Sequence, residues 1–223
     1  LDFLRQEILS LEKSVFSLAR EISAKRKAAA EKMSLEVKKL LQTLGMKDTL
    51  FSVNVSDKQG TDLEQKCGPY GIDDVEFLIA ANPGTPLQSL AKIASGGELS
   101  RVMLALKTVL AQSDSIETLI FDEIDTGIGG EVAVSVGLHL QKLSQKKQVL
   151  CITHLASIAV YADNQLKILK SVENGLTHTQ VLSVQGENRV LEIARMLSGD
   201  AASSESLEHS RAMLLKFSKN GGY

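Results

Sequence analysis

Apolar residues in the first 45 positions recur at alternating steps of three and four, which places them on one face of a helix. One heptad position holds Ile8, Val15, Ile22 and Ala29, and the other holds Leu4, Leu11 and Leu18. After Lys25 the pattern slips, and it resumes in a shifted phase over 33–44. We therefore expect one helix ending near Gly45. About three clean heptads fit either the root of a coiled coil or a long amphipathic helix packed on its own domain.

Short apolar runs separated by turn residues follow this helix. Residues 51–55 and 75–80 predict two strands, the second ending before an Asn82-Pro83-Gly84 turn. Residues 119–121 and 149–152 are apolar runs bounded by polar residues, a pattern typical of strands buried on both faces of a parallel sheet. Strands alternating with helical patterns indicate the α/β class.

The stretch from Val132 to Leu140 has an apolar residue at every second position, which by itself predicts a strand. Two parallel strands, however, need a crossover of about a dozen or more residues, usually a helix. We therefore predict a helix here. Beyond the second parallel strand we expect a hairpin from 166–170 and 176–184 around Asn174-Gly175, then helices over about 187–197 and 203–217 with Gly199 between them.

The segment Ser95-Gly96-Gly97-Glu98 precedes an amphipathic helix. A serine can cap a helix, and two glycines let the backbone approach a ligand closely. The first helical turn then presents free N–H groups and the positive end of the helix dipole, which bind anions such as phosphate. The same tetrapeptide also fits an ordinary Ser-capped helix entered through a glycine turn, and a short glycine motif alone does not separate the two.

Two acids, Asp122 and Glu123, follow the run 119–121, at the strand end where ligands lie in open α/β sheets. Neighbouring side chains on a strand point to opposite sides, so we expect the two acids to have different tasks. Asp122 suits Mg²⁺, directly or through water, and Glu123 suits activation of an attacking water. The alternative is a solvated acidic turn, here extended by Asp125 and a glycine-rich continuation that includes Gly127.

A histidine, His154, closes the second parallel run, where an imidazole can contact a γ-phosphate or an attacking water. A single histidine at a strand end is more often structural, so its candidacy rests on its neighbours along the chain. Asp122 lies 27 residues after Ser95, and His154 lies 32 residues after Asp122. In this order the three segments describe half of an ATP-hydrolysing site.

Composition narrows these possibilities. The 223 residues are 43% hydrophobic and carry a net charge of −2, which fits a globular domain without a basic footprint for nucleic acid. The basic clusters Lys25-Arg26-Lys27 and Lys146-Lys147 are expected to be solvated. Two distant cysteines, Cys67 and Cys151, predict neither a disulfide framework nor a zinc site. Without a signal peptide or a bilayer-spanning run, a cytoplasmic protein is expected.

The motifs together carry a resemblance. Ser95–Glu98 resembles the signature motif of ATP-binding-cassette ATPases, Leu119–Glu123 resembles their Walker B strand, and His154 resembles their switch histidine. The continuation Ile124–Gly130 departs from the Pro-Thr-Ser-Ala-Leu-Asp of transporters. Together with Thr153–Ala159, it is similar to bacterial DNA-repair ATPases related to the SMC family, and the similarity covers essentially the whole chain.

This resemblance implies an α/β fold: the carboxyl-terminal lobe of an ABC/SMC-type P-loop ATPase head over 46–223, with 1–45 as the end of a coiled-coil arm. No Gly-x-x-x-x-Gly-Lys-Ser/Thr phosphate loop (Walker A) occurs in the chain. In the family that loop lies in the amino-terminal half of the same protein. We therefore expect the chain to be part of a longer protein and inactive as an ATPase alone.

The resemblance also implies roles. Two heads would close on two ATP molecules as an ATP-dependent homodimer, with Ser95, Gly96, Gly97 and Glu98 meeting the nucleotide of the partner head. Asp122 would hold Mg²⁺, Glu123 and His154 would be catalytic, and Asp125 and Gly127 would lie at the dimer seam. DNA would be the partner, in cytoplasmic, nucleoid-associated double-strand-break repair and recombination. The alternatives are a transporter ATPase subunit and a non-catalytic SMC-like scaffold.

Overall fold

The computed structural model describes residues 1–82, 84–93, 95–173, 176–199 and 203–217. The chain divides into two compact units: residues 1–42 with 46–93, and residues 43–45 with 94–223. The strands that follow the first helix therefore group with that helix, whereas the sequence prediction places a domain boundary near residue 45. None of the helices in the described ranges is both long enough and apolar enough to cross a membrane.

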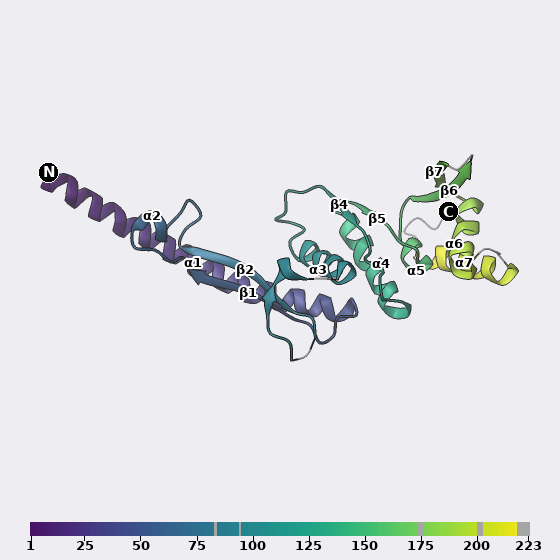
Figure 1. Cartoon of the computed structure of the whole chain (residues 1–223), viewed down its shortest axis with the longest axis horizontal. Helices are drawn as coiled ribbons and strands as arrows, with labels where there is room; N and C mark the ends of the chain where they lie inside the picture. The colour runs from purple at the N-terminus through teal and green to yellow at the C-terminus, as the bar shows by residue number, and fades with distance from the viewer. Residues whose placement is uncertain (83, 94, 174–175, 200–202, 218–223) are drawn as a thin grey trace. The chain divides into compact units, whose positions relative to one another are not determined.

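The first unit is built from one long helix and a small antiparallel sheet (Figure 1). Its elements are α1 (Asp2–Thr43), β1 (Leu50–Asp57), α2 (Leu63–Lys66), β2 (Asp73–Ala80), β3 (Gln88–Ser89) and the 3-10 turn η1 (Leu90–Lys92). Strand β2 lies between β1 and β3, and its register with β1 runs from Leu50 opposite Ala80 to Asp57 opposite Asp73. The predicted helix and both predicted strands are confirmed.

A buried carboxylate fastens α1 to the sheet. Asp73, whose side chain is fully buried, accepts hydrogen bonds from Ser23 Oγ and Arg26 Nη1, both at 2.6 Å. Arg26 also donates to the carbonyl of Tyr70. Lys27 forms an ion pair with Asp57 at 3.4 Å, so these basic residues make ion pairs within the first unit. The prediction that the cluster is merely solvated is therefore wrong for Arg26.

The predicted heptad face of α1 is largely exposed. Each apolar residue of this face in the first 22 positions is between 40 and 65% exposed: Leu4, Ile8, Leu11, Val15, Leu18 and Ile22. The residues that α1 buries are Ala19, Ser23, Ala30, Val37 and Leu41, which occupy a different stripe of the helix. Within the described residues, the heptad seam of the first 22 positions thus has no cover, and its pairing in a coiled coil stays a prediction.

The second unit begins with an α/β arrangement. Strands β4 (Thr118–Phe121) and β5 (Gln148–Cys151) are parallel, with Phe121 opposite Cys151. Helix α3 (Gly96–Val109) precedes β4, and α4 (Gly130–Ser144) makes the crossover between the strands. The predicted helix over the alternating valines is therefore confirmed.

One sequence expectation about these strands is wrong. Leu119 and Phe121 are buried, but Ile120, Leu150 and Ile152 on the opposite face are 69, 44 and 60% exposed. The physical reason is that no described element covers this face, so the apolar side chains meet solvent. Exposed apolar surface of this kind costs free energy in water and is typical of interaction sites.

Helices and a hairpin lie together in the carboxyl-terminal part of the second unit (Figure 1), and the helices share a hydrophobic core. Its elements are α5 (Ala156–Ala159), the antiparallel hairpin β6 (Gln165–Glu173) and β7 (Leu176–Val184), α6 (Glu187–Ser198) and α7 (Ser204–Phe217). Val160, Tyr161, Ile193 and Leu214 are buried together between α5, α6 and α7. The hairpin strands and the last two helices confirm the prediction, while the Asn174-Gly175 turn lies outside the described residues.

Candidate functional site

Helix α3 begins at the predicted signature segment. Ser95 is the N-cap, and its Oγ accepts a long hydrogen bond of 3.4 Å from the Glu98 backbone N–H. Ser95 and Gly96 are exposed, Gly97 is buried and Glu98 is half-buried. The segment therefore presents a helix start with a hydroxyl and little side-chain bulk, which fits the approach of a phosphate group.

The two glycines of the signature differ in what lies against them. A Cβ placed on Gly96 would come within 2.0 Å of Glu123 Oε2, the end of a flexible side chain. A Cβ placed on Gly97 would lie 3.0 Å from both the carbonyl oxygen of Glu123 and the Cβ of Thr126. Gly97 thus lets α3 pack directly on the chain after β4.

This contact gives a stability prediction. Gly97→Ala should lower the free energy of unfolding by about 1–3 kcal/mol, because the backbone around Glu123 and Thr126 must shift. Gly96→Ala should cost much less, since the Glu123 side chain can move and alanine favours the helix by up to about 1 kcal/mol. Urea unfolding of both variants measures the difference. Equal stability of the two variants would contradict the packing described for Gly97.

Side chains of α3 hold the segment after β4 in place. Ser100 Oγ donates to the carbonyl of Asp122 at 2.7 Å. Arg101, which is 7% exposed, donates through Nη1 to the carbonyls of Ile124 at 3.3 Å and Thr126 at 3.0 Å. Burial lowers the pKa of the Arg101 guanidinium, and the nearby Glu98 carboxylate opposes that shift. These hydrogen bonds therefore fasten the signature helix to the acidic segment.

The two predicted acids sit at the end of β4, both exposed. Asp122 Oδ1 accepts the backbone N–H of Glu123 at 2.8 Å, which fixes the orientation of the Asp122 carboxylate. Glu123 has φ of 56°, a left-handed conformation that costs a non-glycine residue about 1–3 kcal/mol and is found preferentially at functional sites. The Thr126 N–H bonds the Glu123 carbonyl at 3.0 Å and closes the turn.

Asp125 is turned inward, toward the end of β5. It is 5% exposed, and its Oδ2 accepts Thr153 Oγ1 at 2.6 Å and the His154 backbone N–H at 2.9 Å. The same oxygen lies 3.0 Å from His154 Nδ1, while the His154 side chain is 74% exposed. Gly127, with φ of 74°, is exposed at the surface of the loop. Contact of Asp125 or Gly127 with a partner head stays a prediction.

The structure thus links all three predicted segments. The signature touches the acids through Gly96 and Gly97, and the acidic segment touches the switch histidine through Asp125. Sequence reasoning missed Ser100, Arg101 and Thr153, which make these links. In the sequence, only their position beside the motifs could have pointed to them. Their hydrogen-bond partners lie 22 to 28 residues away along the chain, and a contact at that separation leaves no local pattern.

The residues present can supply part of a site for Mg²⁺ and ATP. Among the described residues, no three His, Cys, Asp or Glu side chains gather into a metal site. Mg²⁺ nevertheless needs only one or two carboxylates when phosphate oxygens and waters complete its shell, and the oriented Asp122 can supply one. The exposed start of α3 fits a phosphate.

Cys151 does not contribute a nucleophile. Burial raises the pKa of its thiol to about 12, and the charges of Asp125 and Asp122 act in the same direction. The thiol therefore stays protonated at neutral pH, where only the thiolate reacts well.

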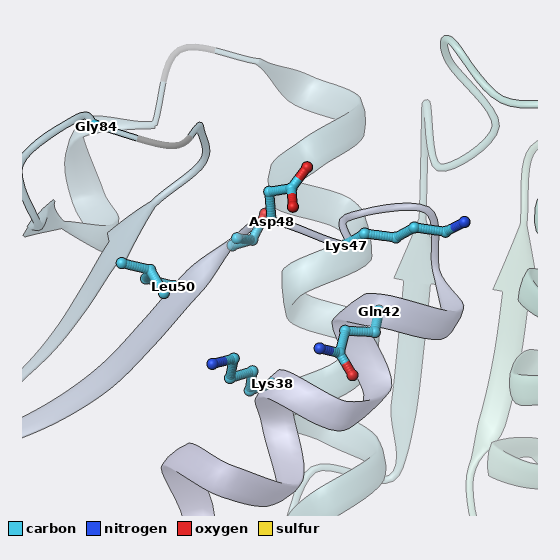
Figure 2. A pocket seen from close by; sticks show the side chains of 7 residues that line it. Lys38, Gln42, Lys47, Asp48, Leu50 and Gly84 are labelled. Atoms are coloured by element: carbon cyan, nitrogen blue, oxygen red, sulfur yellow. The ribbon is translucent and has the colours of Figure 1, made fainter.

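A hollow in the first unit contains none of the predicted site residues. It has a volume of about 420 Å³ and is lined by Lys38, Gln42, Lys47, Asp48, Thr49, Leu50 and Gly84 (Figure 2). Figure 2 shows the amino groups of Lys38 and Lys47 pointing in opposite directions. They do not converge on one ligand, so the hollow is not a candidate anion site.

Sequence comparison finds DNA repair proteins. The DNA repair protein RecN of Treponema pallidum (strain Nichols) is 52% identical over 211 residues, which are 95% of this chain and 37% of that protein. RecN of Bacillus subtilis (strain 168) is 37% identical over 223 residues, with 96 and 39% coverage. The chain thus spans less than two fifths of the length of these relatives. No protein-family model matches it.

Solved structures share the fold at low sequence identity. The Smc head domain of Pyrococcus yayanosii, with a coiled coil and joint, matches 90% of this chain with a TM-score of 0.55 and 17% identity, over 36% of that structure. The Smc head domain of Pyrococcus furiosus, with an extended coiled coil and bound to the C-terminal domain of ScpA, matches 82% with a TM-score of 0.54 and 18% identity, over 42% of its length. The fold is therefore that of the carboxyl-terminal lobe of an SMC-type head, and the sequence matches the carboxyl-terminal portion of RecN DNA repair proteins.

Proposed function

We propose that this chain forms the signature-bearing lobe of an ATPase head that closes on a second head around ATP, in the repair of DNA double-strand breaks. One observation carries the proposal: the signature segment, the two acids after β4 and the histidine after β5 are joined into one cluster by short contacts. A structural helix cap or a solvated acidic turn needs none of these connections.

Residues of this chain have different roles in ATP binding and hydrolysis. Ser95 and the start of α3 bind the γ-phosphate of nucleotide held by the partner head. Asp122 holds Mg²⁺, which when bound neutralises charge on the phosphate oxygens. Glu123 accepts a proton from the attacking water, and His154 contacts the water or the γ-phosphate. Phosphoryl transfer needs mainly positioning and charge stabilisation, so dividing the site between heads makes hydrolysis conditional on their closure.

Two exposed apolar surfaces support a companion lobe from the amino-terminal half of the same protein. The face of β4 and β5 that carries Ile120, Leu150 and Ile152 is the first, and the heptad seam of α1 is the second. We propose that the lobe with the phosphate loop covers the sheet face, and that an antiparallel helix of that half pairs with the seam.

DNA as the partner follows from the family rather than from charge. The net charge is −2, and the basic residues 25–27 are paired with Glu21, Asp73 and Asp57. The RecN relatives are DNA repair proteins, and this supports a role at the chromosome in the cytoplasm.

The first test compares the chain alone with the chain plus the amino-terminal lobe. Alone, it should release phosphate from ATP only at background rate, because no Gly-x-x-x-x-Gly-Lys-Ser/Thr segment is present to hold the phosphates. Addition of the lobe that carries the phosphate loop should produce turnover. Turnover by the chain alone that Glu123→Gln abolishes would contradict the divided site.

A further inference from the structure

Two hydrogen-bond donors and a histidine ring nitrogen lie close to one oxygen of a buried carboxylate. Asp125 Oδ2 lies 2.6 Å from Thr153 Oγ1, 2.9 Å from the His154 backbone nitrogen and 3.0 Å from His154 Nδ1. Thr153 Oγ1 in turn accepts the backbone N–H of Leu155 at 3.0 Å. The end of β5 is thus wrapped around Asp125, which leaves the His154 ring only one nitrogen free of this network.

The geometry has a consequence for the proton on the ring. An ionised carboxylate only accepts hydrogen bonds, and a lone pair on His154 Nδ1 would repel it at 3.0 Å, so the favourable arrangement has the hydrogen on Nδ1. In the neutral ring, Nε2 is then unprotonated, and its lone pair faces away from Asp125. The ring is 74% exposed, so this lone pair is open to a ligand.

We propose that Asp125 is the positioning residue of His154, and that it holds the neutral ring with Nδ1 protonated and Nε2 free to accept a hydrogen bond from the attacking water. The catalytic half of this statement rests on the proposed function. Asp125 itself touches neither water nor nucleotide.

The position of Asp125 is fixed from the signature helix. Arg101 of α3 donates to the carbonyls of Ile124 and Thr126, the residues on either side of Asp125. The carboxylate therefore does not depend on a mobile loop for its placement. A carboxylate held in place beside one ring nitrogen sets the tautomer and the orientation of a functional histidine.

The tautomer can be measured on this chain without nucleotide. In ¹⁵N-labelled protein at about two pH units above the ordinary histidine pKa of about 6.5, protonated and unprotonated ring nitrogens give separate ¹⁵N signals. The His154 signals are assigned by their loss in His154→Gln. We expect Nδ1–H in the parent chain, and a shift of the population toward Nε2–H in Asp125→Ala.

Two variants test whether Asp125 acts on the His154 ring directly or only through the packing of this region. Thr153→Val removes a hydrogen bond to the same Asp125 oxygen but leaves His154 Nδ1 in place, so the tautomer should persist. Asp125→Asn should also keep it, because the Thr153 hydroxyl and the His154 N–H hold the amide oxygen on that side. An Nε2–H ring in the parent, or unchanged signals in a folded Asp125→Ala, would overturn the proposal.

Kinetics with the companion lobe give a second readout. Asp125→Ala should lower kcat by about tenfold or more with little change in KM for ATP, and should add little to the loss caused by His154→Ala. A raised KM at unchanged kcat would show that Asp125 serves binding, and would overturn the positioning role. Absence of turnover in every form would count against the proposed function, and the tautomer measurement would still decide the Asp125–His154 pair.

Discussion

Replacing Glu123 with glutamine in the two-lobe protein is expected to stop ATP turnover while leaving ATP binding intact. Glutamine keeps the size of the side chain but cannot take a proton from water, so kcat should fall by about 10²-fold or more. ATP and Mg²⁺ should then hold the heads closed. Phosphate release measures the first effect, and size-exclusion chromatography with ATP and Mg²⁺ should show a dimer that persists.

A matched change controls for the loss of one negative charge. Glu131→Gln removes an exposed carboxylate from the first turn of α4 and should leave turnover near the parental rate. If Glu123→Gln hydrolysed ATP as fast as the parent, Glu123 would not be the general base, and water activation would pass to His154. The non-catalytic scaffold interpretation predicts instead that the parent two-lobe protein itself shows no ATP turnover.

Most helices and strands could be predicted from local sequence patterns. The stretch 132–140 shows the limit of periodicity, because its valines alternate like a strand while the residues it buries, among them Ala133, Val136 and Leu140, follow helical spacing. The requirement for a crossover between parallel strands resolved this conflict. Helices α6 and α7 were predictable because Gly199, with φ of 84°, separates two amphipathic runs.

The candidate site was predictable as a set of motifs but not as a set of contacts. The contacts of the Asp125 carboxylate with Thr153 and His154 were not predicted, and the place of Asp125 at a dimer seam stays a prediction. A hydrogen bond between residues 28 positions apart leaves no periodic trace in a single sequence. Burial was misjudged for a similar reason, since an apolar residue such as Ile120 cannot reveal whether its face finds a cover.

The second large effect is expected at the signature. Ser95→Arg in the two-lobe protein places bulk and charge where the partner's γ-phosphate should bind, so ATP-driven dimerisation and hydrolysis should both fail. The ATP affinity of a single head should change little, because its phosphate loop lies in the other lobe. Nucleotide titration and size-exclusion chromatography separate these outcomes. Failure of dimerisation together with lost ATP affinity would contradict the assignment.

The loss of a helix cap needs its own control. Ser95 Oγ caps α3 through a bond of 3.4 Å, and Ser203 Oγ bonds the Ser206 N–H at 3.2 Å at the start of α7. Ser203→Arg should therefore cost a similar amount of stability, about 1 kcal/mol, without stopping hydrolysis. Equal loss of activity in both variants would mean that Ser95 acts only through folding.

The division of the site between two heads is the central claim, and mixing two inactive proteins tests it most directly. One carries Ser95→Arg, and the other carries a disabled phosphate loop. In a mixed dimer one site then has both lesions and the other has neither, so a signature that acts across the interface predicts partial recovery of ATP hydrolysis. If Ser95 served the nucleotide of its own head, every site would carry one lesion, and a mixture that stayed inactive would contradict the account.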